Sequence, residues 1–231
     1  MTDSPTFSIT LLTGPVAALG SSGKDSAIAK YPVDCPVALL PQGFESDAQA
    51  DRRVHGGLEK AVHHYPYEHY TTWRTELGPR PALTEPGGFG ENISTTGLTE
   101  HDVAVGDIFR IGTALVQVSQ GRQPCWKLNH RFETPDMSRR VQQSGRSGWY
   151  YRVLEPGIVA PEDQLTCLDR VAPEWTLHRL WHALYVDKMN LDKLKGIAAL
   201  EVLAEGWRKY AVRRLESRRV EDWSKRLDGT E

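Results

Sequence analysis

The sequence has little that would tie the chain to a membrane, a nucleic acid or an oxidising compartment. None of its apolar runs approaches the ~20 residues that a bilayer-spanning helix needs. Its 28 Lys and Arg balance 30 Asp and Glu, for a net charge of −2, so no general surface for a membrane or a nucleic-acid polymer is expected. Only three cysteines are present, Cys35, Cys125 and Cys167, which excludes a disulfide framework. With no signal-peptide pattern in the first ten residues, we expect a reducing, cytoplasmic setting.

The larger part of the sequence, residues 1–170, is broken into short segments by Gly and Pro. Many of these segments are apolar or alternate between apolar and polar residues, which is typical of strands. The clearest predicted hairpin covers residues 107–120, where β-branched residues are frequent. Helices are predicted at only two places here, over 66–77 and within 135–144. This part therefore predicts a barrel-like β domain that carries a few helices.

The pattern changes to helical spacing near Pro173. Leu177, Leu180 and Leu184 share one helix face, and Thr176 is a candidate N-cap for it. Two further stripes follow, so residues 171–231 are expected to form a small three-helix domain. Its basic last part is predicted to be a solvated helix face, the alternative being a docking surface for an acidic partner. The predicted fold class is α+β, predominantly β.

A single cysteine stands in an unusual setting in SQGRQPCWKL, residues 119–128. Pro124 restricts how the chain presents Cys125, and Arg122 and Lys127 bring positive charge, which favours a thiolate over a thiol. A buried spacer, a nucleophile and a metal ligand all remain open from these residues alone. We favour a functional Cys125 at the end of a strand and interpret Cys35 and Cys167 as structural.

Two glycine-containing stretches are candidate binding loops. Gly56 and Gly57 allow a ligand to approach the main chain closely, and His55 precedes them. Residues 87–100 contain Asn92 and Ser94, which suit an anionic ligand, although a plain turn explains the loop equally well. The chain has no zinc-binding histidine spacing and neither of the common nucleotide-binding glycine motifs in these stretches. The remaining histidines are expected at solvated or half-buried positions.

Together these segments resemble the YiiM family of MOSC-domain proteins, and the order of the matches spans essentially the whole chain. The matching segments are SAIAK (26–30), VHGG (54–57), HYPYEHY (64–70), FGEN (89–92), GLTE (97–100), GDIF (106–109) and VSQGRQPCWKLN (118–129). MOSC domains are related to the C-terminal part of molybdenum-cofactor sulfurases. The resemblance implies a MOSC β-barrel domain over 1–170 and a three-helix domain over 171–231.

The resemblance also implies a site for the molybdenum cofactor, a pterin dithiolene with a phosphate. Cys125 is expected to ligate molybdenum, because a soft thiolate suits a metal that already has sulfur ligands. Basic and neutral donors for the phosphate and pterin are expected from Lys30, Arg122, Asn92 and Ser94. The pterin would be lined by His55, Gly56 and Gly57.

The function implied is the reduction of small N-hydroxylated compounds, notably N-hydroxylated nucleobase analogues such as 6-hydroxylaminopurine. The cofactor would carry the redox chemistry, and electrons would come from a separate reductase, a flavoprotein being the expected kind. An alternative is a sulfur carrier or cofactor-delivery protein with a persulfide on Cys125, and another is a scaffolding module. The sequence leaves the natural substrate and the oligomeric state open, a homodimer included.

Overall fold

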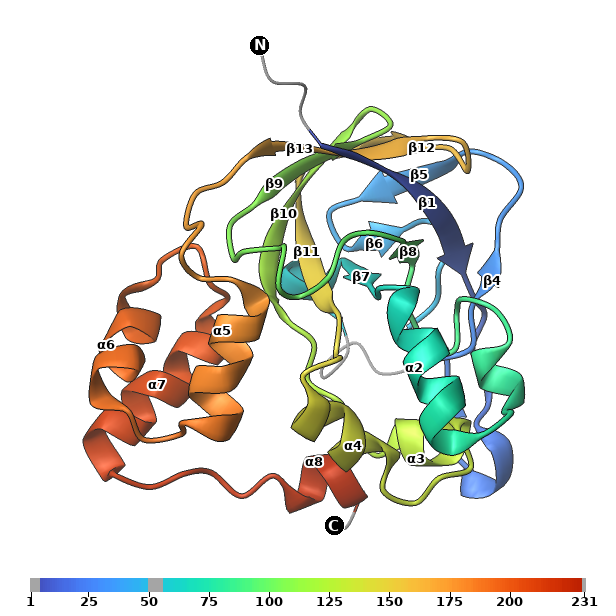
Figure 1. Ribbon diagram of the computed structural model, residues 1–231. Helices are drawn as coiled ribbons and strands as arrows, with labels where there is room; N and C mark the ends of the chain where they lie inside the picture. The colour runs from blue at the N-terminus through green and yellow to red at the C-terminus, as the bar shows by residue number, and fades with distance from the viewer. Residues whose placement is uncertain (1–4, 50–55, 230–231) are drawn as a thin grey trace.

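A computed structural model describes residues 5–49 and 56–229 (Figure 1). Within these residues seven strands close into a barrel: β1 (Thr6–Thr13), β7 (Val62–His64), β8 (Ile93–Thr95), β9 (Ile108–Ile111), β10 (Ala114–Gly121), β11 (Trp149–Glu155) and β13 (Gln164–Asp169). Their order is β13-β9-β10-β11-β7-β8-β1, and β1 pairs with β13 to close the ring. Neighbours are antiparallel except β7 and β8. The prediction of a barrel-like domain is confirmed, and so is the hairpin, as β9 and β10.

Shorter strands flank the barrel. β4 (Tyr31–Pro32) pairs with the C-terminal end of β1, and β2 (Ala17–Ala18) pairs with β3 (Asp25–Ser26). A small second sheet contains β5 (Val37–Leu40), β6 (Gly43–Phe44) and β12 (Gly157–Val159), in the order β12-β5-β6. Lys30, just before β4, and Asp47, three residues after β6, meet at one end of the barrel, where they form an ion pair at 2.5 Å.

Helices cover that end of the barrel. They are α2 (Glu68–Leu77), α3 (Lys127–Arg131) and α4 (Met137–Ser144), with short 3-10 turns η1 (Gly20–Ser22), η2 (Leu58–Lys60) and η3 (Pro81–Leu83). The predicted helices at 66–77 and within 135–144 correspond to α2 and α4. The prediction of only two helices within residues 1–170 was wrong, because α3 is also present and is too short for its apolar spacing to be recognised in the sequence. These helices enclose their own buried cluster, in which Tyr65, Trp73 and Phe89 pack against Leu128 and Phe132.

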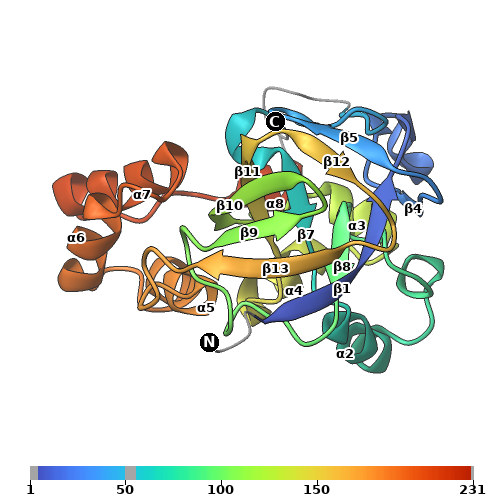
Figure 2. The same ribbon diagram turned by 90° about the horizontal axis from the view of Figure 1, so that it is seen from above.

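The C-terminal part forms a separate lobe beside the barrel and then returns to it (Figures 1 and 2). The lobe contains α5 (Leu177–Trp181), the π turn η4 (His182–Val186), α6 (Leu191–Ala199) and α7 (Glu205–Ser217). As predicted, Thr176 caps α5, accepting a hydrogen bond from Arg179 N at 3.2 Å. The lobe shares one continuous core with the barrel, in which Leu180 and Trp207 belong to the same cluster as Val118.

A last short helix, α8 (Ser224–Asp228), lies under the barrel next to α4 (Figure 1). The prediction of a solvated basic face is therefore wrong at particular positions. Arg214 is only 1% exposed, and its guanidinium donates to Glu221 and to Leu184 O. Arg226 is half-buried and reaches Pro124 and Gln142. Both arginines therefore bind within the protein.

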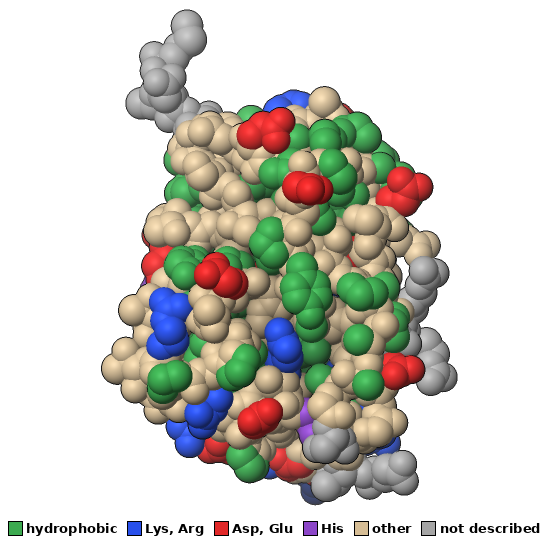
Figure 3. Space-filling model, turned by 90° about the vertical axis from the view of Figure 1, so that its right-hand side faces the viewer, with side chains coloured by type: hydrophobic (Ala, Val, Ile, Leu, Met, Phe, Trp, Pro, Cys, Tyr) green, Lys and Arg blue, Asp and Glu red, His purple; other side chains and the backbone are tan. Residues whose placement is uncertain are grey.

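The surface agrees with the balanced composition. The face seen in Figure 3 carries isolated charges of both signs between apolar side chains, without a field of one sign. Among the helices of the described residues, none combines the length and the apolar character needed to cross a bilayer.

Candidate functional site

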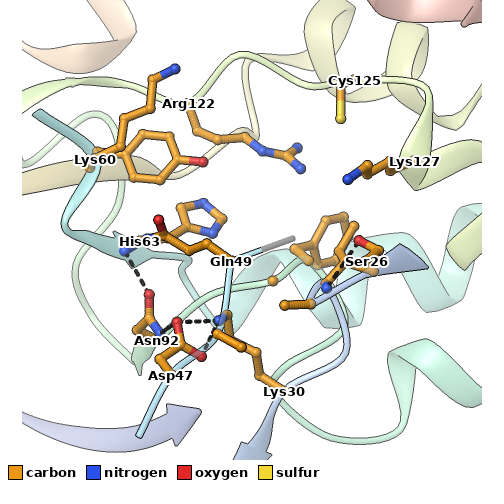
Figure 4. Close-up of a pocket in the computed structure, with 16 residues that line it drawn as sticks. Ser26, Lys30, Asp47, Gln49, Lys60, His63, Asn92, Arg122, Cys125 and Lys127 are labelled. Carbon is orange, nitrogen blue, oxygen red and sulfur yellow. Dashed lines mark hydrogen bonds and ion pairs between the residues drawn. The ribbon is translucent and has the colours of Figure 1, made fainter. Parts of the chain in front are cut away.

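A pocket opens between the barrel end and α3, with about 600 Å³ of empty space including its mouth (Figure 4). Its walls come from segments far apart in the sequence. Asn92 and Arg122 flank barrel strands, and His63 and Tyr150 lie within them. The lining residues are Ser26, Ala27, Ile28, Lys30, Asp47, Ala48, Gln49, Lys60, His63, Phe89, Gly90, Asn92, Arg122, Cys125, Lys127 and Tyr150.

Cys125 lies at the top of this pocket, with its sulfur directed inward (Figure 4). The strand β10 ends at Gly121, and Arg122 N continues the ladder by donating to Gly148 O at 2.9 Å. The chain then leaves the barrel, and α3 begins two residues after the cysteine, with Leu128 N donating to Cys125 O at 3.0 Å. The side chain is 9% exposed, so it is shielded from bulk water while it faces the cavity.

Positive charge gathers around the thiol. Arg122, Lys60 and Lys127 all line the pocket, and burial lowers the pKa of Lys60 while the charge of Cys125 acts in the opposite direction. Among the described lining residues, Asp47 is the only acid, and it is held by Lys30 at 2.5 Å. That pair is buried and neutral as a unit. The lining therefore has more basic than acidic side chains, which favours a negatively charged guest.

Asn92 and Asp47 fix the floor of the pocket. Asn92 Nδ2 donates to Asp47 Oδ2 at 2.9 Å and to Leu12 O at 3.2 Å, and its Oδ1 accepts from His63 N at 3.1 Å. Asp47 Oδ1 also accepts from Gly14 N at 2.9 Å. Because both amide hydrogens of Asn92 are used inside the protein, its structural task is to join β7, β8 and the Asp47 loop.

The other predicted binding residues fall at different places. Ser94 is buried in β8, where its Oγ donates to Tyr65 O at 2.9 Å, and it does not line the pocket. Gly57 has a φ of +98° and begins the η2 turn, so its conformation places Lys60. Gly56 is described but is not among the lining residues, and His55 lies outside the described residues. The structure thus brings Lys30, Asn92, Arg122 and Cys125 together in the pocket lining and leaves Ser94, Gly56 and Gly57 outside it.

Two buried polar atoms of the pocket lack a hydrogen-bond partner among the described residues: His63 Nε2 and Arg122 Nη1. An unsatisfied buried donor or acceptor costs roughly 1–3 kcal/mol, which a ligand that bonds it would recover. Burial first, and then the charge of Arg122, lowers the pKa of His63 well below its usual value, so the ring is neutral. A ring hydrogen bond to the Gly90 backbone then leaves Nε2 as an acceptor facing the pocket, beside a guanidinium donor.

Sequence reasoning missed several residues of this site. Lys60, Asp47 and Tyr150 were not singled out, because each becomes part of the pocket only through the barrel closure. The expectation of solvated histidines was wrong for His63 and His64, which are 4% and 0% exposed. Both belong to β7, in which all three residues are buried, and they stand between the apolar Val62 and Tyr65. Two adjacent histidines in a strand point to opposite faces, so one lines the pocket while the other lies in the barrel, but no local pattern predicted a strand here.

The fold and the cysteine pocket define a MOSC-domain protein, a family of molybdenum-cofactor-binding domains with reductase-type function. The MOSC domain family matches residues 51–166, and the YiiM-like 3-alpha helix domain matches residues 175–218. This chain belongs to the YiiM family of MOSC-domain proteins, as the sequence resemblance indicated.

Similar proteins support that membership along nearly the full length. Protein YiiM of Escherichia coli is 39% identical over 226 residues, covering 96% of this chain and 99% of that protein. A reductase of Gibberella moniliformis is 38% identical over 170 residues, covering 73% of this chain but 30% of that protein. The crystal structure of Escherichia coli YiiM has a TM-score of 0.82 at 32% identity, covering 96% of this chain and 98% of that one. That of YiiM from Geobacillus stearothermophilus has a TM-score of 0.77 at 35% identity, covering 91% and 100%.

Proposed function

We propose that this protein is a molybdenum-cofactor-dependent reductase of N-hydroxylated compounds, with Cys125 as the molybdenum ligand and N-hydroxylated nucleobase analogues such as 6-hydroxylaminopurine among its substrates. The observation that carries the proposal is the inward-facing Cys125 sulfur in a pocket with an excess of basic side chains and two unsatisfied buried polar atoms, His63 Nε2 and Arg122 Nη1, which suits an anionic, hydrogen-bonding guest. When bound, the cofactor would supply the two-electron chemistry that reduces an N–OH group to an amine and water.

The residues present fit such a guest. Arg122 offers an unpaired guanidinium nitrogen and His63 offers an acceptor, a donor–acceptor pair suited to a heterocycle. Lys127 lies near the Cys125 sulfur and Lys60 lines the pocket on its other side, where the two would balance the negative charge of the dithiolene or the phosphate (Figure 4). Lys30 contributes through its pair with Asp47, which shapes the floor.

The protein would exclude water from the pocket and orient the substrate in it. Phe89 and Tyr150 line the pocket beside the cations, and burial raises the pKa of Tyr150 so that its hydroxyl stays protonated. The neutral hydroxyl is placed to orient a substrate by a hydrogen bond. The proposal includes a separate electron-donating reductase, a flavoprotein being the expected kind, and a cytoplasmic setting, which the few scattered cysteines favour.

The test is metal and pterin analysis of protein purified from a host that makes the cofactor, followed by reduction of 6-hydroxylaminopurine with an artificial reductant. We expect molybdenum and pterin in the parent protein and turnover that Cys125→Ala abolishes without unfolding the chain. Cys35→Ala is the matched control, because that thiol is exposed and does not line the pocket, and it should keep full activity.

Three results would overturn the proposal. The first is a persulfide on Cys125 by mass spectrometry with no bound metal and no reductase activity, which would favour the sulfur carrier. The second is undiminished turnover by Cys125→Ala. The third is a failure to bind any pterin under all conditions, which would favour a scaffolding module.

A further inference from the structure

The peptide groups on both sides of Cys125 bind the same distant residue. Arg226 Nη1 donates to Pro124 O, a hydrogen bond between residues 102 positions apart. Trp126 N donates in turn to Arg226 O at 2.8 Å. One residue of α8 therefore holds the carbonyl before the cysteine with its side chain and the amide after it with its main chain.

Arg226 is itself fixed by its surroundings. Its Nη2 donates to Gln142 Oε1 at 2.5 Å, so the guanidinium bridges the Cys125 loop and α4. The next residue, Leu227, is 2% exposed, and its carbonyl accepts from Ser138 Oγ at 2.7 Å and from Asn129 Nδ2 at 3.0 Å. A guanidinium with two fixed acceptors has little conformational freedom, so the position of α8 determines the position of the Pro124–Trp126 loop.

The end of α8 also holds the ring next to the cysteine. Gly229 has a φ of +74°, and a Cβ there would come within 2.9 Å of the Trp126 ring. On another side, Lys24 Nζ lies 4.9 Å from the centroid of that ring. The segment from Pro124 to Trp126 is thus held by contacts with the α8 segment and with Lys24, although no strand within the described residues pairs with it.

We propose that Arg226 is a positioning residue for Cys125 and that α8 is thereby part of the active site. Neither family match reaches this helix, since they cover residues 51–166 and 175–218. The inference rests on the proposed function only for the identity of Cys125 as the reacting group. A metal ligand must be held in one geometry to work, and a loop outside the barrel ladder needs such a support.

The test measures the thiol directly, in cofactor-free protein from a host that cannot make the cofactor. With Cys35→Ser and Cys167→Ser as the background, iodoacetamide reports on Cys125 alone. We expect Arg226→Gln to raise the alkylation rate several-fold, because the released loop exposes the sulfur more often. Arg226→Lys keeps one donor for Pro124 O and should restore part of the protection.

The matched control is Arg139→Gln, which breaks the ion pair between α4 and Asp228 and leaves the Pro124 contact intact. It should leave the alkylation rate unchanged. An unchanged rate in Arg226→Gln would overturn the proposal, and so would an equal rise in Arg139→Gln, because both variants loosen α8. If Arg226→Gln does not fold, a rise in Arg226→Lys or Gln142→Ala supports the proposal and no rise in either overturns it.

A second readout separates this proposal from the proposed function. In cofactor-loaded protein, Arg226→Gln should lower the molybdenum content per chain and kcat, while KM changes little, since the barrel residues of the pocket are untouched. If the protein proves not to be a reductase, the alkylation result still stands, because it needs neither cofactor nor substrate. If the alkylation rate does not respond while Cys125→Ala abolishes turnover, only the positioning role fails.

Discussion

The two halves of the pocket are held in place by different means. The barrel half contains His63, Asn92, Arg122 and the Lys30–Asp47 pair. Backbone pairing of the barrel continues into this half, because Asn92 N donates to His63 O at 2.7 Å and Arg122 N donates to Gly148 O at 2.9 Å. The helix half, Cys125 and Lys127, lies beyond the last ladder bond and is held by α8. Strand pairing thus positions the barrel half, and contacts with α8 position the helix half.

The strongest way to break the barrel half is Gly148→Ala. Gly148 has a φ of +71°, and an added Cβ would lie 2.2 Å from His64 O across the strands that form the site. Left-handed strain and overpacking together predict a loss of about 4 kcal/mol in the free energy of unfolding. Urea denaturation measures it, with Gly206→Ala as the control, because nothing lies within 4 Å of a Cβ at that helical glycine. An equal midpoint for both variants would mean that the strands adjust around the methyl group.

Asp47→Asn should have the next largest effect on the barrel half. The change leaves Lys30 as an unpaired charge with a side chain only 6% exposed, and removal of one partner from a buried pair costs about 3 kcal/mol. It also weakens the contact with Asn92, so pterin content should fall together with stability. Thermal unfolding and cofactor analysis report the two effects. Stability equal to that of the parent would show that solvent reaches Lys30.

Acid should weaken the barrel half before the helix half. His64 is enclosed by Tyr151 and Thr95, and burial lowers its pKa to about 3. The folded ring stays neutral where the unfolded chain takes up a proton, so stability falls as the pH drops below about 6.5, by about 2 kcal/mol at pH 5 relative to pH 8. Urea midpoints at several pH values measure the slope. His64→Gln should reduce the slope to the part that the buried His63 contributes, and a matched change at the exposed His130 should leave it unchanged.

The sequence predicted the barrel half better than the helix half for a physical reason. Alternation and turn residues specify strands locally, so the β9–β10 hairpin and the strand that ends just before Arg122 could be predicted from neighbouring residues alone. The family motifs added Lys30, Asn92 and Arg122 as candidates, and all three line the pocket. Asp47 and Lys60 join them only when the barrel closes, which no local pattern specifies.

The support of the helix half could not be predicted from any local pattern. Arg226 belongs to a basic segment in which solvated positions are the usual outcome, and nothing near it indicates a partner 102 residues away. The same holds for Arg214, whose burial depends on Glu221 and on the carbonyl of Leu184. Basic side chains in a tail show their partners only when the tertiary structure is known.

The smallest predicted effect on the free energy of unfolding comes from a serine of α4 that contacts α8, and it compares the two halves directly. Ser138 and Ser144 lie on the same helix, but Ser138 Oγ donates to Leu227 O of α8 at 2.7 Å, whereas Ser144 Oγ donates within α4 to Val141 O at 3.2 Å. Ser138→Ala should cost about 1 kcal/mol, since it leaves a buried carbonyl one hydrogen bond short, and Ser144→Ala should cost less.

Amide hydrogen exchange then shows which half of the pocket loses stability in Ser138→Ala. In Ser138→Ala the Trp126 amide, whose acceptor is Arg226 O, should exchange faster, while the Asn92 amide, bonded to His63 O across the barrel, should keep its rate. Faster exchange at both amides would mean that the two halves open together and that α8 stabilises the whole molecule. Faster exchange at Trp126 alone would show that the cysteine side of the pocket can loosen while the barrel side stays closed.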